Sequence, residues 1–442
     1  MTLADPVIVV PGITASYLRD EYPIPAEYVW KVVRKSYQRV TLHPDNLDYE
    51  AIEPARVRAD QLFEVAYEEF IEELRYNLSP SLDRPVPVFP FIYDWRKPLE
   101  KIEDSLAAFV EEVVGRTKLL GHYHTAGYAK NPRVNLVGHS MGGLIITGYL
   151  AAAGGKAPIN KVVTLATPYQ GSYEAVIQVT TGTGNLGTKA PSSRERDAAR
   201  VTPALYHLLP SFGGAVSAPP GTPKSLFNPK AWQPTIVDSI AEFIRLSGLP
   251  LDGRRKKSER QKEAAALFGK MLSAAKKHRT RIDNFQLPNA GMQPRDWLAV
   301  IGTAATTRVR LNVEIRHGAP HFLLSSKDRQ DQWSNANPVK ARQTGDGTVP
   351  LEGAIPKFLD QSELVCVTPD DYGYWEIEDK VLTKVSGFHG LLPNMNMLHR
   401  LIVRFFTGAS DRRGNTWGYP VPGVEKWSPP LKLKPKKREI KE

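Results

Sequence analysis

The chain contains very little cysteine and no long hydrophobic run. Cys366 is the only cysteine among 442 residues, so no disulfide can form within the chain and nothing points to an oxidising compartment. No apolar run approaches the roughly 20 residues that a membrane-spanning helix requires. These two absences argue against a disulfide-stabilised secreted domain and against an integral membrane protein.

The first residues also lack the features of a secretory signal. Residues 1–5 have neither a basic start nor the beginning of a long apolar run. A short strand-like segment follows at residues 6–10, so we expect the fold to begin near residue 6. With no signal and one cysteine, the sequence predicts a cytoplasmic location.

Acidic residues are fewer than basic ones, 47 against 58, which gives a formal net charge of +11. Much of the excess lies in residues 254–281 and 432–442. Basic surface attracts phosphate groups, including those of anionic lipids and nucleic acids. The chain has no zinc-ligand spacing and no RNA-binding signature, so we expect no nucleic-acid partner. Peripheral contact with an anionic membrane surface stays open, as does a solvated surface with no ligand.

Strand patterns and helical patterns alternate in the first part of the chain. Strands are predicted at residues 6–10, 86–92, 134–139 and 161–166, and helices at residues 61–76, 99–113 and 144–150. The prolines in the run 86–92 favour a position near a sheet edge. Such alternation is typical of an α/β fold with a mostly parallel central sheet and helices on both faces.

The alternation stops after residue 168 and resumes near residue 296. Strands are then predicted at 297–302 and 363–367, with a last helix at 395–406. We therefore expect a core made of residues 1–168 and 296–408, interrupted by an inserted cap or lid region, residues 169–295. Residues 409–442 are expected to form a C-terminal extension that ends in a basic, flexible tail.

The inserted region contains one long predicted helix, residues 258–278. Its apolar face lies between lysines and consists of Leu267, Phe268, Met271 and Leu272. Such a helix could be a lid that rests on a lipid surface. The same pattern is typical of a helix that simply covers a core.

The stretch 134–143 has the pattern of a nucleophile elbow. An apolar strand meets Gly138-His139-Ser140-Met141-Gly142, and a helical pattern follows at once. In this context a serine lies on a sharp turn between strand and helix, with its hydroxyl exposed at the end of the sheet. Ser140 is therefore the predicted nucleophile.

A serine hydroxyl needs a base, and the base needs an acid that orients it. In sheets of this type the acid and the histidine follow the serine in that order. Asp346, in the glycine-flanked segment 344–350, is the best acid, although a plain surface turn explains that segment equally well. His389, in the glycine-flanked loop 386–390, is the best base. The other histidine after Asp346, His399, lies within a helical pattern and is expected to be packed or on the surface.

Two backbone N–H groups are needed to stabilise the oxyanion of a tetrahedral intermediate. We expect one from Met141, directly after the nucleophile, and one from Ile13, in the loop after the first strand. Pro11 has no N–H, and Gly12 allows the turn. The histidine pairs 122/124 and 317/321 have no obvious third ligand, so no metal site and no organic cofactor are predicted.

Taken in order, these motifs resemble the lecithin:cholesterol acyltransferase family of α/β-hydrolases, which includes lysosomal phospholipase and related bacterial lipases. The resemblance rests on the following motifs: Pro11-Gly12, Tyr93-Asp94-Trp95-Arg96, the Ser140 pentapeptide, Thr167-Pro168, Gly-Asp346-Gly-Thr-Val-Pro and His389-Gly. It implies an α/β-hydrolase fold, with Ser140, Asp346 and His389 as the triad and Ile13 and Met141 as oxyanion donors. It also implies esters of lipid-like acyl chains as substrates. The secreted animal members have disulfides, which a single cysteine excludes here.

The sequence thus predicts a serine hydrolase that cleaves carboxylic esters, such as a lipase, phospholipase or esterase. An O-acyltransferase would use the same triad, and so would an amidase, a thioesterase or a polyester depolymerase. A third alternative is a hydrolase-shaped protein without catalysis, which binds an anionic partner through its basic surface. The substrate and the oligomeric state are left open.

Overall fold

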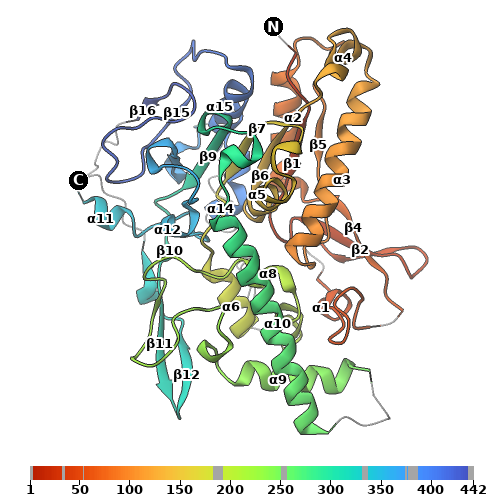
Figure 1. Ribbon diagram of the computed structural model, residues 1–442, viewed down its shortest axis with the longest axis vertical. Helices are drawn as coiled ribbons and strands as arrows, with labels where there is room; N and C mark the ends of the chain where they lie inside the picture. The colour runs from red at the N-terminus through yellow and green to blue at the C-terminus, as the bar shows by residue number, and fades with distance from the viewer. Residues whose placement is uncertain are drawn as a thin grey trace.

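The computed structural model of the chain describes residues 3–31, 35–52, 54–182, 193–249, 256–330, 337–373, 376 and 387–436. A central parallel sheet of six strands forms its middle layer (Figure 1). The strand order is β14-β9-β7-β6-β1-β5. These strands are β1 (Val7–Val10), β5 (Val88–Pro90), β6 (Val134–His139), β7 (Ile159–Leu165), β9 (Trp297–Gly302) and β14 (Val365–Val367).

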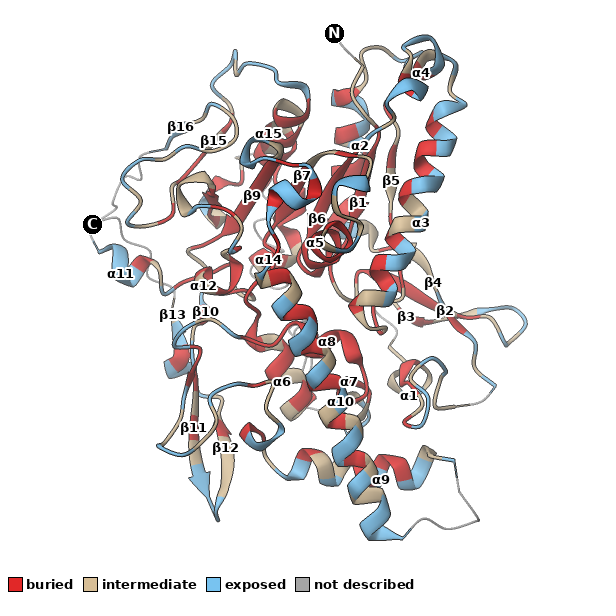
Figure 2. Ribbon diagram, viewed as in Figure 1, coloured by how far each residue is buried: buried red, intermediate tan, exposed pale blue. Residues whose placement is uncertain are grey.

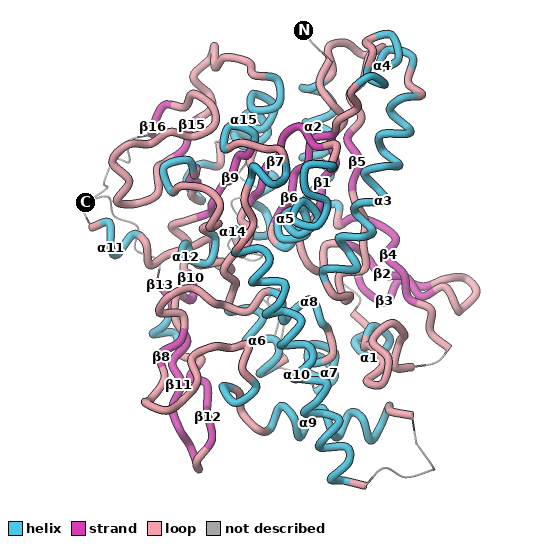
Figure 3. The backbone as a smooth tube through the Cα atoms, in the orientation of Figure 1, coloured by secondary structure: helices cyan, strands magenta, loops and turns pink. Residues whose placement is uncertain are grey.

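Side-chain alternation along β1 divides the core into two layers. Ile8 and Val10 belong to the cluster on one face of the sheet, whereas Val7 and Val9 belong to the cluster on the other. The first face is covered by α3 (Leu99–Lys118) and α5 (Met141–Ala153), and the second by α2 (Glu64–Leu78) and α15 (Asn396–Thr407). The predicted parallel sheet with helices on both faces is therefore confirmed (Figure 3).

Smaller elements surround this sheet near the N-terminal part of the chain. A three-stranded antiparallel sheet consists of β2 (Ser16–Asp20), β3 (Glu27–Trp30) and β4 (Val57–Leu62). Two short helices are α1 (Tyr37–Val40) and α4 (Gly121–Thr125). β5 lies at one edge of the main sheet, as its prolines predicted.

The segment 169–295 is mostly helical and lies below the carboxyl ends of the sheet strands in Figure 1. Its helices are α6 (Tyr173–Thr181), α7 (Ser193–Arg200), α8 (Pro203–His207), α9 (Thr235–Ser247) and α10 (Lys257–Asp283). α10 is buried along one side and exposed along the other (Figure 2). Phe268, Met271 and Leu272 lie on the buried side, and Leu267 is half-buried. This apolar face therefore covers the core, which was one of the two interpretations of the helical pattern, the other being a lid on a lipid surface.

Strands on both sides of residue 296 pair with each other. β8 (Val216–Ser217), within the segment 169–295, pairs with β11 (Leu311–Arg316), and β11 forms a hairpin with β12 (Ala319–Leu323). β10 (Thr307–Arg308) and β13 (Arg329–Gln330) form a second small pair. The division of the chain at residues 168 and 296 stays a prediction, and the β8–β11 pairing crosses it.

The last described segment packs on the other edge of the main sheet. Tyr419 exchanges two backbone hydrogen bonds with Cys366 of β14, at 2.8 and 2.9 Å. β15 (Trp417–Gly418) pairs with β16 (Lys434–Pro435), and α11 (Pro338–Ala341) and α12 (Leu351–Ala354) lie before β14 in the chain. The end of the predicted basic tail, residues 437–442, lies outside the described residues. So do residues 183–187 of the inserted region, residues 254 and 255 of the basic segment 254–281, and residue 386 of the loop 386–390.

Candidate active site

Ser140 lies on a strained turn between β6 and α5. Its φ of 54° and ψ of −126° are unusual for a residue with a side chain. A Cβ at Gly142 would lie 2.1 Å from the carbonyl oxygen of Val10, and one at Gly143 would lie 1.9 Å from Oγ1 of Thr167. The glycines therefore let the turn pack directly against the neighbouring strands, as the elbow pattern predicted.

The imidazole of His389 lies beside this serine. His389 is on α14 (Phe388–Leu391), which begins after Gly387, whose φ is 83°. Its Nε2 lies 2.9 Å from Oγ of Ser140, and its Nδ1 lies 2.7 Å from Oδ2 of Asp346. A carboxylate only accepts hydrogen bonds, so Nδ1 carries the proton of the neutral ring. Nε2 is then free to accept the Ser140 hydroxyl proton.

Asp346 reaches this position on a tight loop that returns to the carboxyl end of β9. The loop bonds to Ala305, and the Asp346 Cβ fills the space in which a Cβ of Gly302 would stand, at 2.6 Å. Its Oδ1 accepts the N–H groups of Thr348 and Val349, at 2.9 and 2.7 Å. This leaves Oδ2 for His389 and fixes the direction of the carboxylate.

The three side chains are almost enclosed. Ser140 is 7% exposed, His389 9% and Asp346 1%. Low exposure strengthens the electrostatic interaction between a carboxylate and an imidazole. The structure thus brings the predicted nucleophile, base and acid into one hydrogen-bonded row.

The two predicted oxyanion donors flank the serine. Met141 is the first residue of α5, and Gly12 is so close to Ser140 that a Cβ on it would lie 3.0 Å from the Ser140 Cβ. Ile13 follows Gly12 directly. Neither the Met141 N–H nor the Ile13 N–H donates to an acceptor within the described part of the chain. Both are therefore available to a ligand atom.

His139 and Tyr67 also belong to this site, and the sequence analysis did not find them. Nε2 of His139 lies 3.0 Å from the carbonyl oxygen of His389, and its Nδ1 lies 2.6 Å from the Tyr67 hydroxyl. A carbonyl only accepts, so Nε2 carries the proton, and Nδ1 accepts from Tyr67. Burial, together with the nearby His389, holds the pKa of His139 well below its usual range, which keeps this ring neutral.

His139 is part of the pentapeptide 138–142 that contains Ser140, so the sequence did place it next to the nucleophile. Tyr67 gave no such signal, because the helical pattern over 61–76 rests on Leu62, Val65, Phe70 and Leu74. Phe70 and Leu74 are buried in the structure, as that pattern indicates. The structure begins α2 at Glu64, leaves Val65 53% exposed and buries Tyr67. Leu62, which the pattern assigned to the helix, is the last residue of β4.

The remaining histidines lie outside the site. His399 is buried on α15, where its Nε2 donates to the Pro393 carbonyl at 2.6 Å. Of the 122/124 pair, His122 bonds to the Pro85 carbonyl at 3.0 Å. The 317/321 pair lies at the β11–β12 hairpin. Within the described ranges, no three His, Cys, Asp or Glu side chains gather as metal ligands would.

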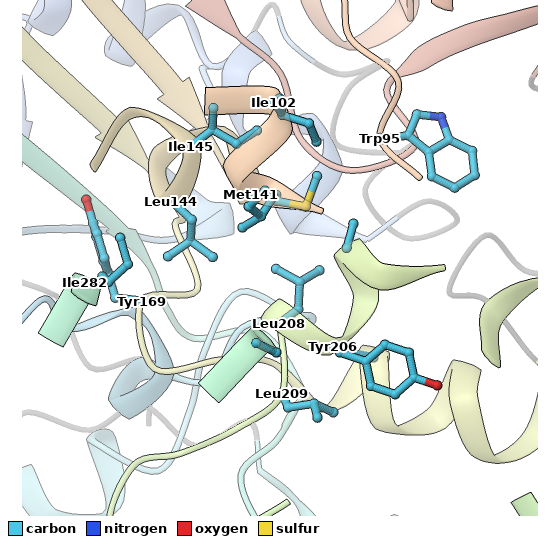
Figure 4. Packing of buried hydrophobic residues seen from close by; sticks show 14 of the residues in the cluster. Trp95, Ile102, Met141, Leu144, Ile145, Tyr169, Tyr206, Leu208, Leu209 and Ile282 are labelled. Atoms are coloured by element: carbon cyan, nitrogen blue, oxygen red, sulfur yellow. The ribbon is translucent and has the colours of Figure 1, made fainter. Parts of the chain in front are cut away.

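Apolar residues of the segment 169–295 pack next to the elbow. Figure 4 shows Met141 of α5 opposite Leu208, which follows α8, and Leu144 and Leu209 belong to the same apolar cluster. Tyr206 of α8 packs its ring against Phe268 of α10, with 5.9 Å between ring centroids. One continuous apolar cluster thus joins this segment to the helix that begins at the serine.

Comparisons with known proteins agree with this architecture. A sequence model described as lecithin:cholesterol acyltransferase matches residues 81–243, which include Ser140. No curated protein matches the chain. Among solved structures, a Tle4-Tli4 complex contains a chain of 14% identity and TM-score 0.55, and the match covers 93% of this chain and 100% of that one.

Two further structures are more distant. The mature lipase BlEst2 of Bacillus licheniformis has 12% identity and TM-score 0.35, with 87% of this chain and 90% of that one covered. Phospholipase PlaB from Legionella pneumophila has 13% identity and TM-score 0.23, covering 56% and 37%. In the described residues, no helix has the length and apolar character needed to cross a bilayer. Residues 81–243 are thus similar to the lecithin:cholesterol acyltransferase family, and the six-stranded parallel sheet with helices on both faces is that of an α/β-hydrolase fold.

Proposed function

We propose that the chain is a serine hydrolase that cleaves carboxylic esters, with lipid-like acyl chains as its preferred substrates. One observation carries the proposal. His389 has one ring nitrogen 2.9 Å from the Ser140 hydroxyl and the other 2.7 Å from the Asp346 carboxylate. This is the arrangement that turns a weak hydroxyl nucleophile into a strong one. The family match supports the choice of an acyl substrate.

The reaction proceeds in two halves. Ser140 Oγ attacks the acyl carbonyl carbon while Nε2 of His389 takes the hydroxyl proton. The carbonyl oxygen becomes an oxyanion that the N–H groups of Ile13 and Met141 stabilise. The tetrahedral intermediate then expels the alcohol, which leaves with the proton from His389, and an acyl-Ser140 ester remains.

Water completes the cycle by the same steps. His389 takes a proton from water as its oxygen attacks the acyl-Ser140 carbonyl, and the proton returns to Oγ as the acid leaves. Asp346 keeps the Nδ1 proton in place and stabilises the positive imidazolium that forms in each half. If an alcohol replaces water, the same steps transfer the acyl group, and the family match favours this as the second candidate function.

The test is Ser140→Ala, assayed with p-nitrophenyl butyrate. Turnover should fall by about 10⁴-fold or more, because the covalent step is lost. The midpoint of thermal unfolding of Ser140→Ala should differ little from that of the wild type. Ser105→Ala on the exposed side of α3 is the matched control and should keep wild-type turnover. Wild-type turnover in Ser140→Ala would refute the proposal.

A fluorophosphonate probe addresses the alternative of a protein without catalysis. Such a probe should label the wild type at Ser140 and leave Ser140→Ala unlabelled. No labelling of the wild type would favour a binding protein. Products formed from a lipid ester with an added alcohol separate hydrolysis from acyl transfer, and a panel of amides, thioesters and polyesters separates the remaining alternatives.

We also propose that contact with an anionic membrane would occur through charge alone. The exposed side of α10 has Lys262, Lys270, Lys276 and Lys277, whereas Phe268, Met271 and Leu272 are buried and Leu267 is half-buried. Each lysine near an anionic surface contributes about 1 kcal/mol. Replacing Lys270, Lys276 and Lys277 by Gln should then weaken binding to phosphatidylserine vesicles, and unchanged binding would refute the contact.

A further inference from the structure

The loop that ends β1 is held by two buried tyrosine hydroxyls that come from different elements. Tyr93, which follows β5, lies with its hydroxyl 2.7 Å from the Pro11 carbonyl oxygen and 3.1 Å from that of Gly12. Tyr67 of α2 lies with its hydroxyl 3.0 Å from the Gly12 nitrogen. Both side chains are enclosed, at 4% and 2% exposure.

The direction of each hydrogen bond follows from its partners. A carbonyl only accepts, so Tyr93 donates its single hydroxyl hydrogen to the two carbonyls, with Pro11 the nearer. The Gly12 N–H only donates, so the Tyr67 oxygen accepts it, and the Tyr67 hydrogen goes to Nδ1 of His139. Burial raises the pKa of both tyrosines, which keeps these hydroxyl hydrogens in place.

These contacts hold the peptide plane between Pro11 and Gly12 at its two opposite edges. The Pro11 carbonyl and the Gly12 N–H belong to the same trans peptide and point in opposite directions. Tyr93 holds the first and Tyr67 holds the second. Rotation of this plane would break both contacts inside the protein interior, where unpaired polar groups are costly.

The next peptide carries the predicted oxyanion donor. Its carbonyl is that of Gly12, which faces Tyr93, so its N–H, that of Ile13, points the opposite way. Gly12 lies against Ser140, and the Ile13 N–H has no acceptor in the described part of the chain. From this geometry we infer that Tyr67 and Tyr93 are positioning residues that together aim the Ile13 N–H at the oxyanion formed on Ser140.

This inference rests on the proposed function, because it concerns a charge that exists only if Ser140 attacks an acyl group. Neither tyrosine touches the reacting atoms. Their effect is to keep the Ile13 donor aligned before the charge develops, so that no reorganisation is needed in the transition state. Loss of one tyrosine hydroxyl should therefore reduce kcat much more than it changes KM.

The test compares Tyr67→Phe and Tyr93→Phe with Tyr123→Phe as a matched control. Tyr123 is equally buried, and its hydroxyl donates to the Ala4 carbonyl at 2.7 Å, near the other end of β1. Removing an oxyanion donor lowers kcat by roughly 10²-fold to 10³-fold, so a misaligned donor should lower it by about 10-fold in each test variant. KM should stay within about twofold, and Tyr123→Phe should keep the wild-type kcat.

A second readout separates alignment from general loosening of the fold. A trifluoromethyl ketone adds to a reactive serine and forms a tetrahedral oxyanion, whereas an ether of the same shape has no carbonyl. Affinity for the ketone should fall about as much as kcat in Tyr67→Phe and Tyr93→Phe, and affinity for the ether should not. Equal losses for both ligands, or a wild-type kcat in both variants, would overturn the inference.

Tyr67 also contacts His139, so its variant could act through His389 instead. Tyr93 has no such contact among the described residues, which makes Tyr93→Phe the cleaner variant, and it remains available should Tyr67→Phe not fold. The pH profile of kcat/KM should be unchanged in Tyr93→Phe, and a shifted profile would count against the inference. Failure of the proposed function would give a different result, because Ser140→Ala would then retain turnover. In that case a change of kcat in the tyrosine variants could not be attributed to an oxyanion on Ser140.

Discussion

The molecule contains two buried pairs of histidine and carboxylate that are alike at first sight. His389 lies 2.7 Å from Asp346, and His278 lies 2.7 Å from Glu103. The first pair stands at the carboxyl ends of the sheet strands. The second lies between helices, because Glu103 is on α3 and His278 is on α10. Only the first pair is proposed to take part in catalysis.

The neighbours of each pair account for the difference. His389 presents its second nitrogen to Ser140, whereas the His278 ring meets the ring of His207 at 4.8 Å between centroids. Arg281 forms a close ion pair with Glu103, and Glu100 lies 3.8 Å from His207. Burial raises the pKa of Glu103 to about 7, and burial beside Arg281 and Arg279 lowers that of His278 to about 3. The second pair thus joins α10 to α3 without a nucleophile to activate.

The largest expected contrast comes from changing the acid of each pair to its amide. Asp346→Asn should lower kcat by about 10⁴-fold, because the amide favours the wrong tautomer of the histidine. Glu103→Gln should leave kcat within about twofold, since it touches no reacting atom. Ester turnover at matched protein concentration measures both. Equal losses in the two variants would remove the distinction between the pairs.

A smaller effect is expected on stability when Glu103 is removed altogether. Glu103→Ala leaves His278 and Arg281 without their acceptor, and leaving buried donors unpaired costs up to about 3 kcal/mol. Arg281 is partly exposed, so the loss should fall at or below that figure. Urea unfolding gives the free energy of unfolding. A loss under about 0.5 kcal/mol would show that the pair does not hold α10 on α3.

The smallest effect concerns His399, a buried histidine bonded to a carbonyl instead of a carboxylate. Burial lowers its pKa from 6.5 to about 4. Between these values the unfolded chain binds a proton that the folded chain does not, so the free energy of unfolding falls as pH drops from 6.5 to 4. At pH 5 the loss is about 2 kcal/mol.

His399→Gln can keep a donor near the Pro393 carbonyl but cannot bind that proton. Urea unfolding of both proteins between pH 4 and 7 should therefore give a flatter profile for the variant. Parallel profiles would assign the acid sensitivity to other groups.

Much of the sheet and of the proposed site could be predicted from the sequence, because their signals are local. The elbow combines a strand, a glycine-flanked serine and a helix in consecutive residues, and the order of Asp346 and His389 along the chain was informative. The buried face of α2 was predicted only in part, because Phe70 and Leu74 are buried as the pattern indicates, whereas Val65 is exposed. The pattern joined Leu62 of β4 to the helix, and it could not show that Tyr67 is buried against His139, a residue far along the chain.

The periodicity of the sequence also does not indicate which segments far apart in the chain contact each other. The apolar residues of α10 indicated a buried or lipid-facing side, and only the structure shows Phe268 packed against Tyr206 and Trp232. The pairing of β8 with β11 brings together residues about a hundred positions apart, and nothing in the sequence of either strand indicates its partner. The role inferred for Tyr67 depends on the same kind of contact.

The pairing of Tyr419 with Cys366 has a consequence for solubility. An open parallel sheet has two edges, and each is a template on which strands of other molecules can add. Pro90 removes a donor from the free edge of β5, whereas the β14 edge is occupied by the segment that contains Tyr419. A chain shortened to residue 408 would therefore expose an apolar strand edge, and we expect it to aggregate on refolding.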